Sequence, residues 1–309
     1  MPPSGVPSLI IQVVGYHSIE FLPSCFEAIG RQTLNKYHVI YINNSSGDGS
    51  SGWVAENAPG TLVLESPLSR GYAGGHNVGI RATWEWGAEW YLFLNPDVYL
   101  APNCLERLLA VADSRCGLYQ PLLLYPDGAI QTSGNKLHYL GFGCSGKALH
   151  SPNARQVEIA YPSGAALLVS RRVIEKIGPF LEDLHLYHED LEFGLRARLA
   201  GFSAWTVPDA RAIHAHDFAG RTQNKFFMLE RNRWFLLGLL LNLQEFVVLL
   251  PLLLSAEAAV VLLAFRQGWL KRKLWAAMDA VRLLPSIRRS RRLWRRFQTH
   301  PWPVLWPVM

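Results

Sequence analysis

The chain has few cysteines, and they lack the spacing that would make them structural. They are Cys25, Cys104, Cys116 and Cys144. A disulfide framework or a zinc site requires paired cysteines, so the sequence predicts neither and suits a reducing compartment. The first 16 residues also lack a basic stretch followed by a long apolar run, so we expect the start of a cytosolic domain and not a signal peptide.

Acidic residues are scarce in one part of the chain. Residues 266–296 hold eleven Lys and Arg but a single acid, Asp279. The formal net charge of the whole chain is +6, so the remainder is net acidic and the basic character belongs to this segment. We therefore expect no nucleic-acid partner. Half of the 309 residues are apolar, which excludes a disordered chain and predicts one large domain with an appendage, or two modest domains.

Apolar runs alternate with helical segments over the first 130 residues. Strands are predicted at 8–16, 37–45, 61–66 and 90–98, and helices near 20–32, 50–57, 75–87 and 103–113. Continuous apolar strands separated by helices indicate an α/β fold with a mostly parallel sheet covered on both faces. Such sheets bind ligands at the carboxyl ends of their strands, so the polar residues after each run are the candidates for a site.

Small and polar residues follow the second and third runs. In NNSSGDGS (43–50), Asp48 either caps the next helix or accepts a hydrogen bond from a nucleotide base or ribose. SRGYAGGHNVGI (69–80) is glycine-rich before a helix, which lets backbone N–H groups approach a phosphate. It matches neither the P-loop nor the dinucleotide pattern, so a plain glycine-rich loop is the competing interpretation.

The fourth run, YLFLNPDVYL (91–100), ends on Asn95, Pro96 and Asp97. A carboxylate placed where a strand stops is either a turn former or a metal ligand. Mg²⁺ and Mn²⁺ bridge phosphates with only one or two protein carboxylates, so one Asp opposite a glycine-rich stretch is chemically sufficient.

A second cluster lies downstream of a strand predicted at 161–171. Residues 186–202 open with His188, Glu189 and Asp190, and apolar residues then recur at four-residue spacing, which predicts one buried helix headed by acids. Either these acids favour the helix N-terminus through its macrodipole, or one of them is a general base.

Two histidines follow in VPDARAIHAHDF (207–218). His214 and His216 lie on the same face if this segment is extended. A single histidine is usually structural, whereas two beside a carboxylate and phosphate site are candidates for a metal ligand.

Six stretches together resemble the inverting glycosyltransferases of family 2 with the GT-A fold, in particular the bacterial rhamnosyltransferase-like branch. They occur in the family's order and cover about residues 8–235: VVGYHSIEFLPSCFEAIGRQT, VIYINNSSGDGS, SRGYAGGHNVGI, YLFLNPDV, SGAALLVSR and LYHEDLEFGLRARLAGF. The resemblance implies transfer of a sugar, rhamnose among the candidates, from a nucleoside-diphosphate donor to a lipid-linked or polysaccharide acceptor in cell-envelope glycan synthesis. It also implies Mg²⁺ or Mn²⁺ as cofactor.

The resemblance assigns residues on the donor side. Asp48 corresponds to the acid at the nucleotide base, and Asp97 to the last Asp of the metal-binding Asp-x-Asp motif, whose first Asp is replaced by Asn95. His214 aligns with the metal-facing His, with His216 as the alternate. The implied donor-binding set is Asn44, Ser45, Asp48, Arg70, Gly71, Gly74, Gly75, Asn77, Asn95 and Asp97.

The resemblance also assigns the catalytic side. Asp190 falls on the Asp of the family's Glu-Asp pair, which takes the acceptor proton during back-side attack, and Glu189 precedes it. The implied acceptor-side residues are Ser163, Gly164, His188 and Glu192, the last replacing an Asp often found there. Two other classes are kept as alternatives: a sugar-nucleotide nucleotidyltransferase, although its lysine-rich phosphate loop is absent, and a non-catalytic membrane scaffold.

The C-terminal part is predicted to be helical and membrane-associated. Residues 234–265 are apolar but interrupted by Asn242, Gln244, Glu245, Pro251 and Glu257. A spanning helix needs about 20 largely apolar residues, so we expect a helix within one leaflet or at the interface. Residues 265–297 interleave tryptophans with Arg and Lys, which is typical of an amphipathic segment on anionic lipid. A buried helix pair with a solvated basic tail is the competing interpretation.

These expectations give a domain plan. Residues 1–233 form the GT-A domain, with 1–130 as the nucleotide-sugar half and 131–233 as the acceptor and catalytic half, and 234–309 form the tail. We expect peripheral or monotopic attachment at the cytoplasmic face of the inner (plasma) membrane, with an anionic membrane surface as a partner.

Overall fold

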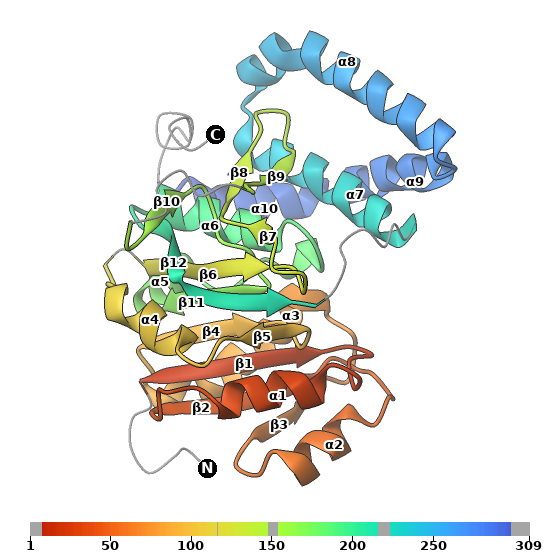
Figure 1. The fold of residues 1–309 in the computed structure, drawn as a ribbon. Coiled ribbons are helices and arrows are strands. Elements are labelled where there is room, and N and C mark those ends of the chain that lie inside the picture. The colour runs from red at the N-terminus through yellow and green to blue at the C-terminus, as the bar shows by residue number, and fades with distance from the viewer. Residues whose placement is uncertain (1–7, 116, 148–153, 216–222, 298–309) are drawn as a thin grey trace.

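The computed structural model describes residues 8–115, 117–147, 154–215 and 223–297 (Figure 1). The apolar runs of the first 100 residues form strands separated by helices, as predicted. The elements are β1 (Leu9–Gly15), α1 (Leu22–Gly30), β2 (Tyr37–Asn43), α2 (Ser50–Asn57), β3 (Leu62–Glu65), α3 (Gly71–Thr83), the 3₁₀ turn η1 (Trp84–Trp86), β4 (Trp90–Leu94), β5 (Val98–Leu100) and α4 (Cys104–Val111).

The second half has shorter strands and more helix. Its elements are β6 (Gly117–Leu124), β7 (Ile130–Thr132), β8 (Asn135–Leu137), β9 (Gly143–Ser145), β10 (Val157–Ile159), β11 (Ala166–Ser170), α5 (Arg171–Ile177), the 3₁₀ turn η2 (Glu182–Leu184), α6 (Glu189–Leu199), β12 (Ser203–His214), α7 (Gln223–Leu240), α8 (Leu243–Arg266), α9 (Leu270–Arg282) and α10 (Leu284–Trp294).

One sheet organises the molecule. Its strand order is β10-β12-β6-β11-β4-β1-β2-β3, with β5 paired to β12 and β7 to β6. The block β4-β1-β2-β3 is parallel throughout, as the alternating pattern predicted. Beyond it the sheet is mixed, because β11 runs antiparallel to both β4 and β6 while β12 runs parallel to β6. The α/β fold with helices on both faces is confirmed.

Helices cover both faces because alternate strand residues are apolar on both sides. Ile11 of β1 belongs to the cluster that packs under α1, α2 and α4. Its neighbour Ile10 belongs to the cluster under α3, α5 and α6. The parallel strands therefore end at one common edge between these two layers.

Two local predictions were wrong. The stretch 69–80 is not a loop before a helix, because α3 already begins at Gly71. Tertiary packing overrides the poor helix propensity of its glycines: a Cβ on Gly71 would lie 2.1 Å from the His185 carbonyl oxygen, and one on Gly75 would lie 2.6 Å from Val14. The strand predicted at 90–98 is two strands, since β4 stops at Leu94 and β5 begins at Val98.

The tail is joined to the sheet domain by a continuous helix. The expected boundary at 233 falls inside α7, whose Phe235, Leu236 and Leu239 pack with Leu191 of α6 and Ile287 of α10 in one apolar cluster. Figure 1 shows α7 to α10 gathered on one side of the sheet, with α8 and α9 forming an arm that projects from the body.

Polar residues that interrupt the tail's apolar sequence have structural roles. Asn242 and Glu245 form a reciprocal capping box at the start of α8. Glu257 pairs with Lys273 of α9 at 2.5 Å and with Arg233 of α7, and Glu230 of α7 completes the group. Within the described residues α8 alone is long and apolar enough to cross a membrane, by length and composition only, and it is mostly unburied.

Candidate functional site

A cleft of about 410 Å³ opens at the carboxyl end of β4. It gathers residues from the β4–β5 turn, the start of β11, the end of β12 and the start of α6. Eight of the residues proposed from sequence line it: Asn95, Asp97, Ser163, Gly164, His188, Glu189, Asp190 and His214. Segments more than 100 residues apart therefore contribute to one cavity.

Asp97 and His214 face each other across the β5–β12 pairing. His214 Nε2 lies 3.4 Å from Asp97 Oδ2, and His214 Nδ1 lies 2.7 Å from Gln131 Oε1. When Nδ1 donates its proton to Gln131, Nε2 is an acceptor that faces a carboxylate. Asp97 Oδ1 is buried without a hydrogen-bond partner among the described residues. One carboxylate oxygen and one imidazole nitrogen directed at the same point fit a divalent cation.

The protein supplies only part of a coordination shell. No group of three His, Cys, Asp or Glu side chains converges anywhere in the described ranges. A metal held by Asp97 and His214 would therefore need further ligands from outside the protein, as Mg²⁺ sites built on one or two carboxylates do.

The carboxylates of Glu189 and Asp190 stand at the N-terminus of α6. Asp190 Oδ2 accepts a hydrogen bond of 2.9 Å from the Gly164 N–H, and Oδ1 accepts one of 2.7 Å from Leu191. Burial raises the pKa of Asp190, while these N–H groups lower it. Burial and the adjacent Asp190 charge raise the pKa of Glu189 well above its usual value, and Glu189 Oε2 has no partner among the described residues. The two N–H groups therefore favour ionisation of Asp190 over that of Glu189.

Gly164 sets the orientation of Asp190. Its carbonyl oxygen accepts a 2.7 Å hydrogen bond from the Tyr72 hydroxyl of α3. A Cβ at this position would lie 3.1 Å from the Tyr72 ring and 3.3 Å from the Asp190 Cβ. The close approach of these two side chains thus depends on glycine at 164.

The backbone before α6 is strained. His185, Tyr187 and His188 all have positive φ, between 60° and 67°, which is costly for residues other than glycine. Asn232 of α7 holds this segment through Nδ2, which lies 2.9, 2.9 and 2.7 Å from the carbonyl oxygens of Leu184, Leu186 and Tyr187. A residue of α7 therefore fixes the approach to the carboxylate pair.

His188 lines the cleft as a neutral imidazole. Burial and the charge of Arg233 lower the pKa of His188 to about 4. The side chain adds a polar group beside Glu189 without adding charge.

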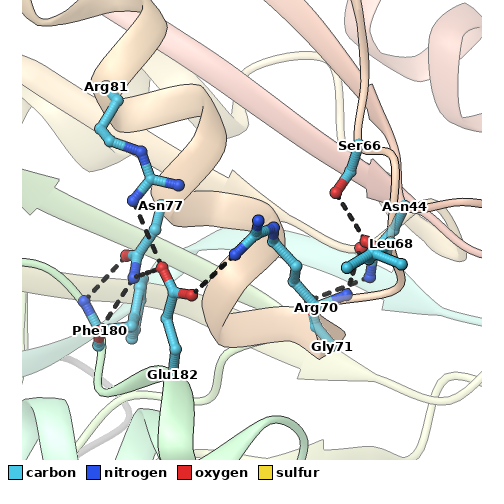
Figure 2. Close-up of polar contacts among 9 residues, drawn as sticks. All are labelled: Asn44, Ser66, Leu68, Arg70, Gly71, Asn77, Arg81, Phe180 and Glu182. Carbon is cyan, nitrogen blue, oxygen red and sulfur yellow. Dashed lines mark hydrogen bonds and ion pairs between the residues drawn. The ribbon is translucent and has the colours of Figure 1, made fainter.

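Three donor-side candidates make contacts that hold the fold together. Figure 2 shows Asn77 bonded to the Phe180 backbone and to Glu182, and Arg70 directed at the same Glu182. Asn44 bonds both the Arg70 N–H and the Gly71 carbonyl oxygen, so it joins the end of β2 to the start of α3. Their roles at the donor stay predictions.

Asp48 is also engaged by the protein. Oδ2 accepts the N–H groups of Ser18 and Ile19, and Oδ1 accepts Ser46 Oγ and the Ser50 N–H. Burial opposes ionisation here, but these bonds outweigh it and lower the pKa of Asp48 to about 2. Asp48 therefore ties the loop after β1 to the loop after β2, and its contact with a base stays a prediction.

The remaining candidates lie outside the cleft lining. Ser45 is exposed, and Gly74 and Gly75 are buried in α3. Glu192 is buried and bonded to Arg196 and to the indole N–H of Trp294. His216 lies outside the described residues.

Several cleft residues were missed from the sequence. Gln131 orients His214, Tyr72 orients Gly164, and Lys147 places a cation in the lining. Asn232, which lies outside the cleft lining, had a usable signal, because Glu230 to Arg233 is a run of four polar residues between two apolar stretches of α7. Such a run in a buried helix indicates partners for every polar group.

Comparisons with known proteins bear on the family and the fold. The family described as Glycosyl transferase family 2 matches residues 9–178. An N-acetylglucosaminyl-diphospho-decaprenol L-rhamnosyltransferase from Mycobacterium tuberculosis is 28% identical over 227 residues, covering 65% of this chain and 72% of its own.

Solved structures with low sequence identity share the fold. GalNAc-T7 with UDP, GalNAc and Mn²⁺ has a TM-score of 0.62 at 12% identity and covers 77% of this chain. This chain spans 49% of that protein. The mannosyltransferase PcManGT from Pyrobaculum calidifontis, in complex with GDP-Man and Mn²⁺, has a TM-score of 0.56 at 18% identity and covers 95% of this chain and 86% of its own.

The raised pKa of Glu189 predicts a pH-dependent stability. The folded protein favours the neutral form of Glu189, and this preference stabilises the fold. The stabilisation is complete below the pKa that Glu189 has in the unfolded chain, and it is lost as the pH rises toward the higher pKa of the folded state. The free energy of unfolding of the wild type should fall from pH 4.5 upward more steeply than that of Glu189→Gln. Denaturant unfolding at several pH values measures both slopes. The exposed Glu175→Gln is the control, and identical slopes for wild type and Glu189→Gln would contradict the assignment.

Proposed function

The chain belongs to glycosyl transferase family 2, and we propose that it moves a hexose, rhamnose first among the candidates, from a nucleoside-diphosphate donor to a hydroxyl group with inversion. The acceptor is a lipid-linked or glycan intermediate of the cell envelope. The observation that carries this proposal is the single cleft in which Asp97 and His214 accompany Glu189 and Asp190. The mycobacterial relative, whose name specifies a lipid-linked diphosphate acceptor, supports the acceptor class.

The proton step belongs to Asp190. Two backbone N–H groups fix its carboxylate and support its ionised form, while Glu189 holds the proton of the pair. Asp190 then accepts the hydroxyl proton of the acceptor as that oxygen attacks the anomeric carbon from the face opposite the diphosphate. Back-side attack inverts the anomeric configuration. Ser163, Gly164 and His188 line the cleft beside Asp190 and form the acceptor side.

Asp97 and His214 are the residues that would hold Mg²⁺ or Mn²⁺. A bound cation would neutralise the negative charge that develops on the departing diphosphate. Lys147, which lines the same cleft, adds a second positive charge for the phosphates. The metal pair draws on both predicted halves, since Asp97 comes from residues 1–130 and His214 from residues 131–233, which also contribute the carboxylate pair.

The tail places the enzyme on the cytoplasmic face of the inner membrane without crossing it. Glu257 lies in the middle of α8 and pairs with Arg233 and Lys273. If α8 spanned the bilayer, this charged group would lie in the hydrocarbon core, which is energetically unfavourable. Helices α8 and α9 expose large apolar residues, among them Val248, Phe265 and Met278. Peripheral or monotopic attachment brings the cleft to a lipid-linked acceptor.

Replacement of the base tests the reaction. We expect Asp190→Asn to lower turnover by about 10²–10⁴-fold while donor affinity stays within about threefold, because general-base catalysis acts on the chemical step. The assay follows nucleoside diphosphate release from dTDP-rhamnose and other sugar nucleotides with Mn²⁺ and a prenyl-diphosphate acceptor. Asp209→Asn, on the exposed side of β12, is the matched control.

The outcomes separate the alternatives. Near-normal turnover of Asp190→Asn would move the base to Glu189. Pyrophosphate exchange in place of nucleoside diphosphate release would support a nucleotidyltransferase, and wild-type protein inactive with every donor and acceptor would support a scaffold.

Loss of Asp97 should remove metal-dependent donor binding. Calorimetry of wild type with a nucleoside diphosphate should show tighter binding with Mn²⁺ than with a chelator, and Asp97→Ala should abolish that difference. The reason is that Asp97 supplies the carboxylate of the proposed metal pair, Asp97 and His214. Asp209→Ala serves as the control, and equal wild-type affinity with and without Mn²⁺ would refute the metal role.

Membrane attachment is measured with vesicles. The whole chain should sediment with anionic vesicles at low salt and partly dissociate as the ionic strength rises, because basic segments are attracted to anionic lipid. Replacing exposed Val248, Phe265 and Met278 with Ser should reduce sedimentation at high salt, where apolar burial dominates. Wild-type protein that remains in the supernatant with every vesicle would refute the attachment.

A further inference from the structure

An apolar groove of about 560 Å³ lies among the four tail helices, apart from the cleft that holds the carboxylates. Helices α7 to α10 all contribute to it. Its apolar lining includes Trp234, Leu237, Leu241, Phe246, Ala277 and Val281. The lining also contains Glu257, whose charge is paired with Arg233 and Lys273. A groove of this size and lining accommodates a hydrocarbon chain.

A second hollow of about 390 Å³ adjoins this groove and is lined by arginines. Its lining consists of Asn242, Leu243, Arg288, Arg291, Arg292 and Arg295. Asn242, Leu243 and Arg291 line both hollows, so the apolar groove and the arginine hollow share a border.

The four arginines lie on one face of α10 and its C-terminus. Their spacing repeats at three and four residues, so neighbouring guanidinium groups repel one another. Arg288, Arg292 and Arg295 form no ion pair within the part of the chain that the structure describes, and Arg291 donates a 3.3 Å hydrogen bond to the carbonyl oxygen of Gly238. An anion bound among them relieves this repulsion.

Arginines beside an apolar groove indicate which kind of molecule binds there. A free phosphate fits the arginines but leaves the groove empty, and a nucleic acid has no use for an apolar groove. Residues 298–309 are apolar and follow α10, but they contain no Asp or Glu that matches four arginines. A lipid that carries a phosphate and a hydrocarbon chain satisfies both hollows.

We propose that α7 to α10 form a binding site for one anionic phospholipid, with its phosphate among Arg288, Arg291, Arg292 and Arg295 and an acyl chain in the groove. The site deepens the membrane attachment proposed above, since it makes one lipid a specific ligand. It is independent of the sugar-transfer chemistry, because none of its residues lines the cleft of Asp97 and Asp190.

The test uses monomeric lipid, which removes the bulk charge of a membrane. The whole chain is titrated calorimetrically with dioctanoyl phosphatidylglycerol below its micelle concentration, at about 0.15 M salt so that exposed charges are screened. We expect one lipid per chain. The zwitterionic dioctanoyl phosphatidylcholine and inorganic phosphate alone should each bind at least about tenfold more weakly.

Two matched charge variants locate the phosphate. Arg288→Gln with Arg292→Gln removes two charges from the hollow, whereas Arg289→Gln with Arg296→Gln removes two exposed charges from the same helix end. The first pair should weaken phosphatidylglycerol binding at least about tenfold, as expected for lost hydrogen bonds to a charged group. The second pair should change it by less than about threefold.

A matched pair of tryptophan variants locates the chain. Ala277→Trp fills part of the groove, and Ala259→Trp adds the same side chain to an exposed position of α8 outside it. Only Ala277→Trp should weaken binding of phosphatidylglycerol.

Each other result overturns the proposal. Equal losses in both arginine pairs would mean diffuse electrostatics, and equal affinity for phosphatidylcholine would remove the role of the arginines. If inorganic phosphate bound as tightly as the lipid, the arginines would form an anion site and the groove would contribute nothing to binding. Tighter binding of a single-stranded oligonucleotide would assign the face to nucleic acid. Binding only after removal of residues 298–309 would make that segment the occupant. In every case the Arg288→Gln, Arg292→Gln variant should transfer sugar to a soluble acceptor at the normal rate. Failure of the lipid-site proposal can therefore be told apart from failure of the transferase proposal.

Discussion

The buried ion pair between Glu192 and Arg196 fixes the helix on which the catalytic carboxylates stand. Both side chains are fully buried, and their two hydrogen bonds are 2.8 and 2.9 Å long. Arg196 also reaches the carbonyl oxygens of Ile177 and Pro179, so α6 is tied to the end of α5. A buried charge needs such complete pairing, because an unpaired one costs several kcal/mol. The direction of Glu189 and Asp190 follows from this anchoring.

The same carboxylate joins the tail to the catalytic half. Trp294 of α10 donates its indole N–H to Glu192 at 2.7 Å, and Ser286 of α10 bonds Asp183 in η2. Arg231 of α7 adds bonds to the carbonyl oxygens of Asp183 and Leu184. The tail therefore helps to hold the segment that leads to the candidate site, in addition to the membrane role proposed for it. Movement of α7 or α10 would act on the strained segment before α6.

The parallel strands of the sheet could be predicted because the apolar run that marks each of them is a local sequence pattern. Continuous apolar runs define β1 to β4, and the polar residues after β4 and before α6 indicated Asp97 and the carboxylate pair. The start of α3 was missed because close packing against His185 and Val14 outweighs the low helix propensity of glycine. Gln131 and Asn232 were missed because their importance lies in contacts across 83 and at least 45 residues of sequence. No periodic pattern reports such contacts.

The four charges that join α7, α8 and α9 also constrain how this arm can vary. Glu230, Arg233, Glu257 and Lys273 sum to zero charge and come from three helices. Replacing one of them leaves a charge without its partner in apolar surroundings, whereas replacing all four by apolar residues of similar volume need not destabilise the arm. Substitutions in this group are therefore tolerated best when all four residues change together. An apolar residue at 257 would accordingly be tolerated best together with an uncharged residue at 273.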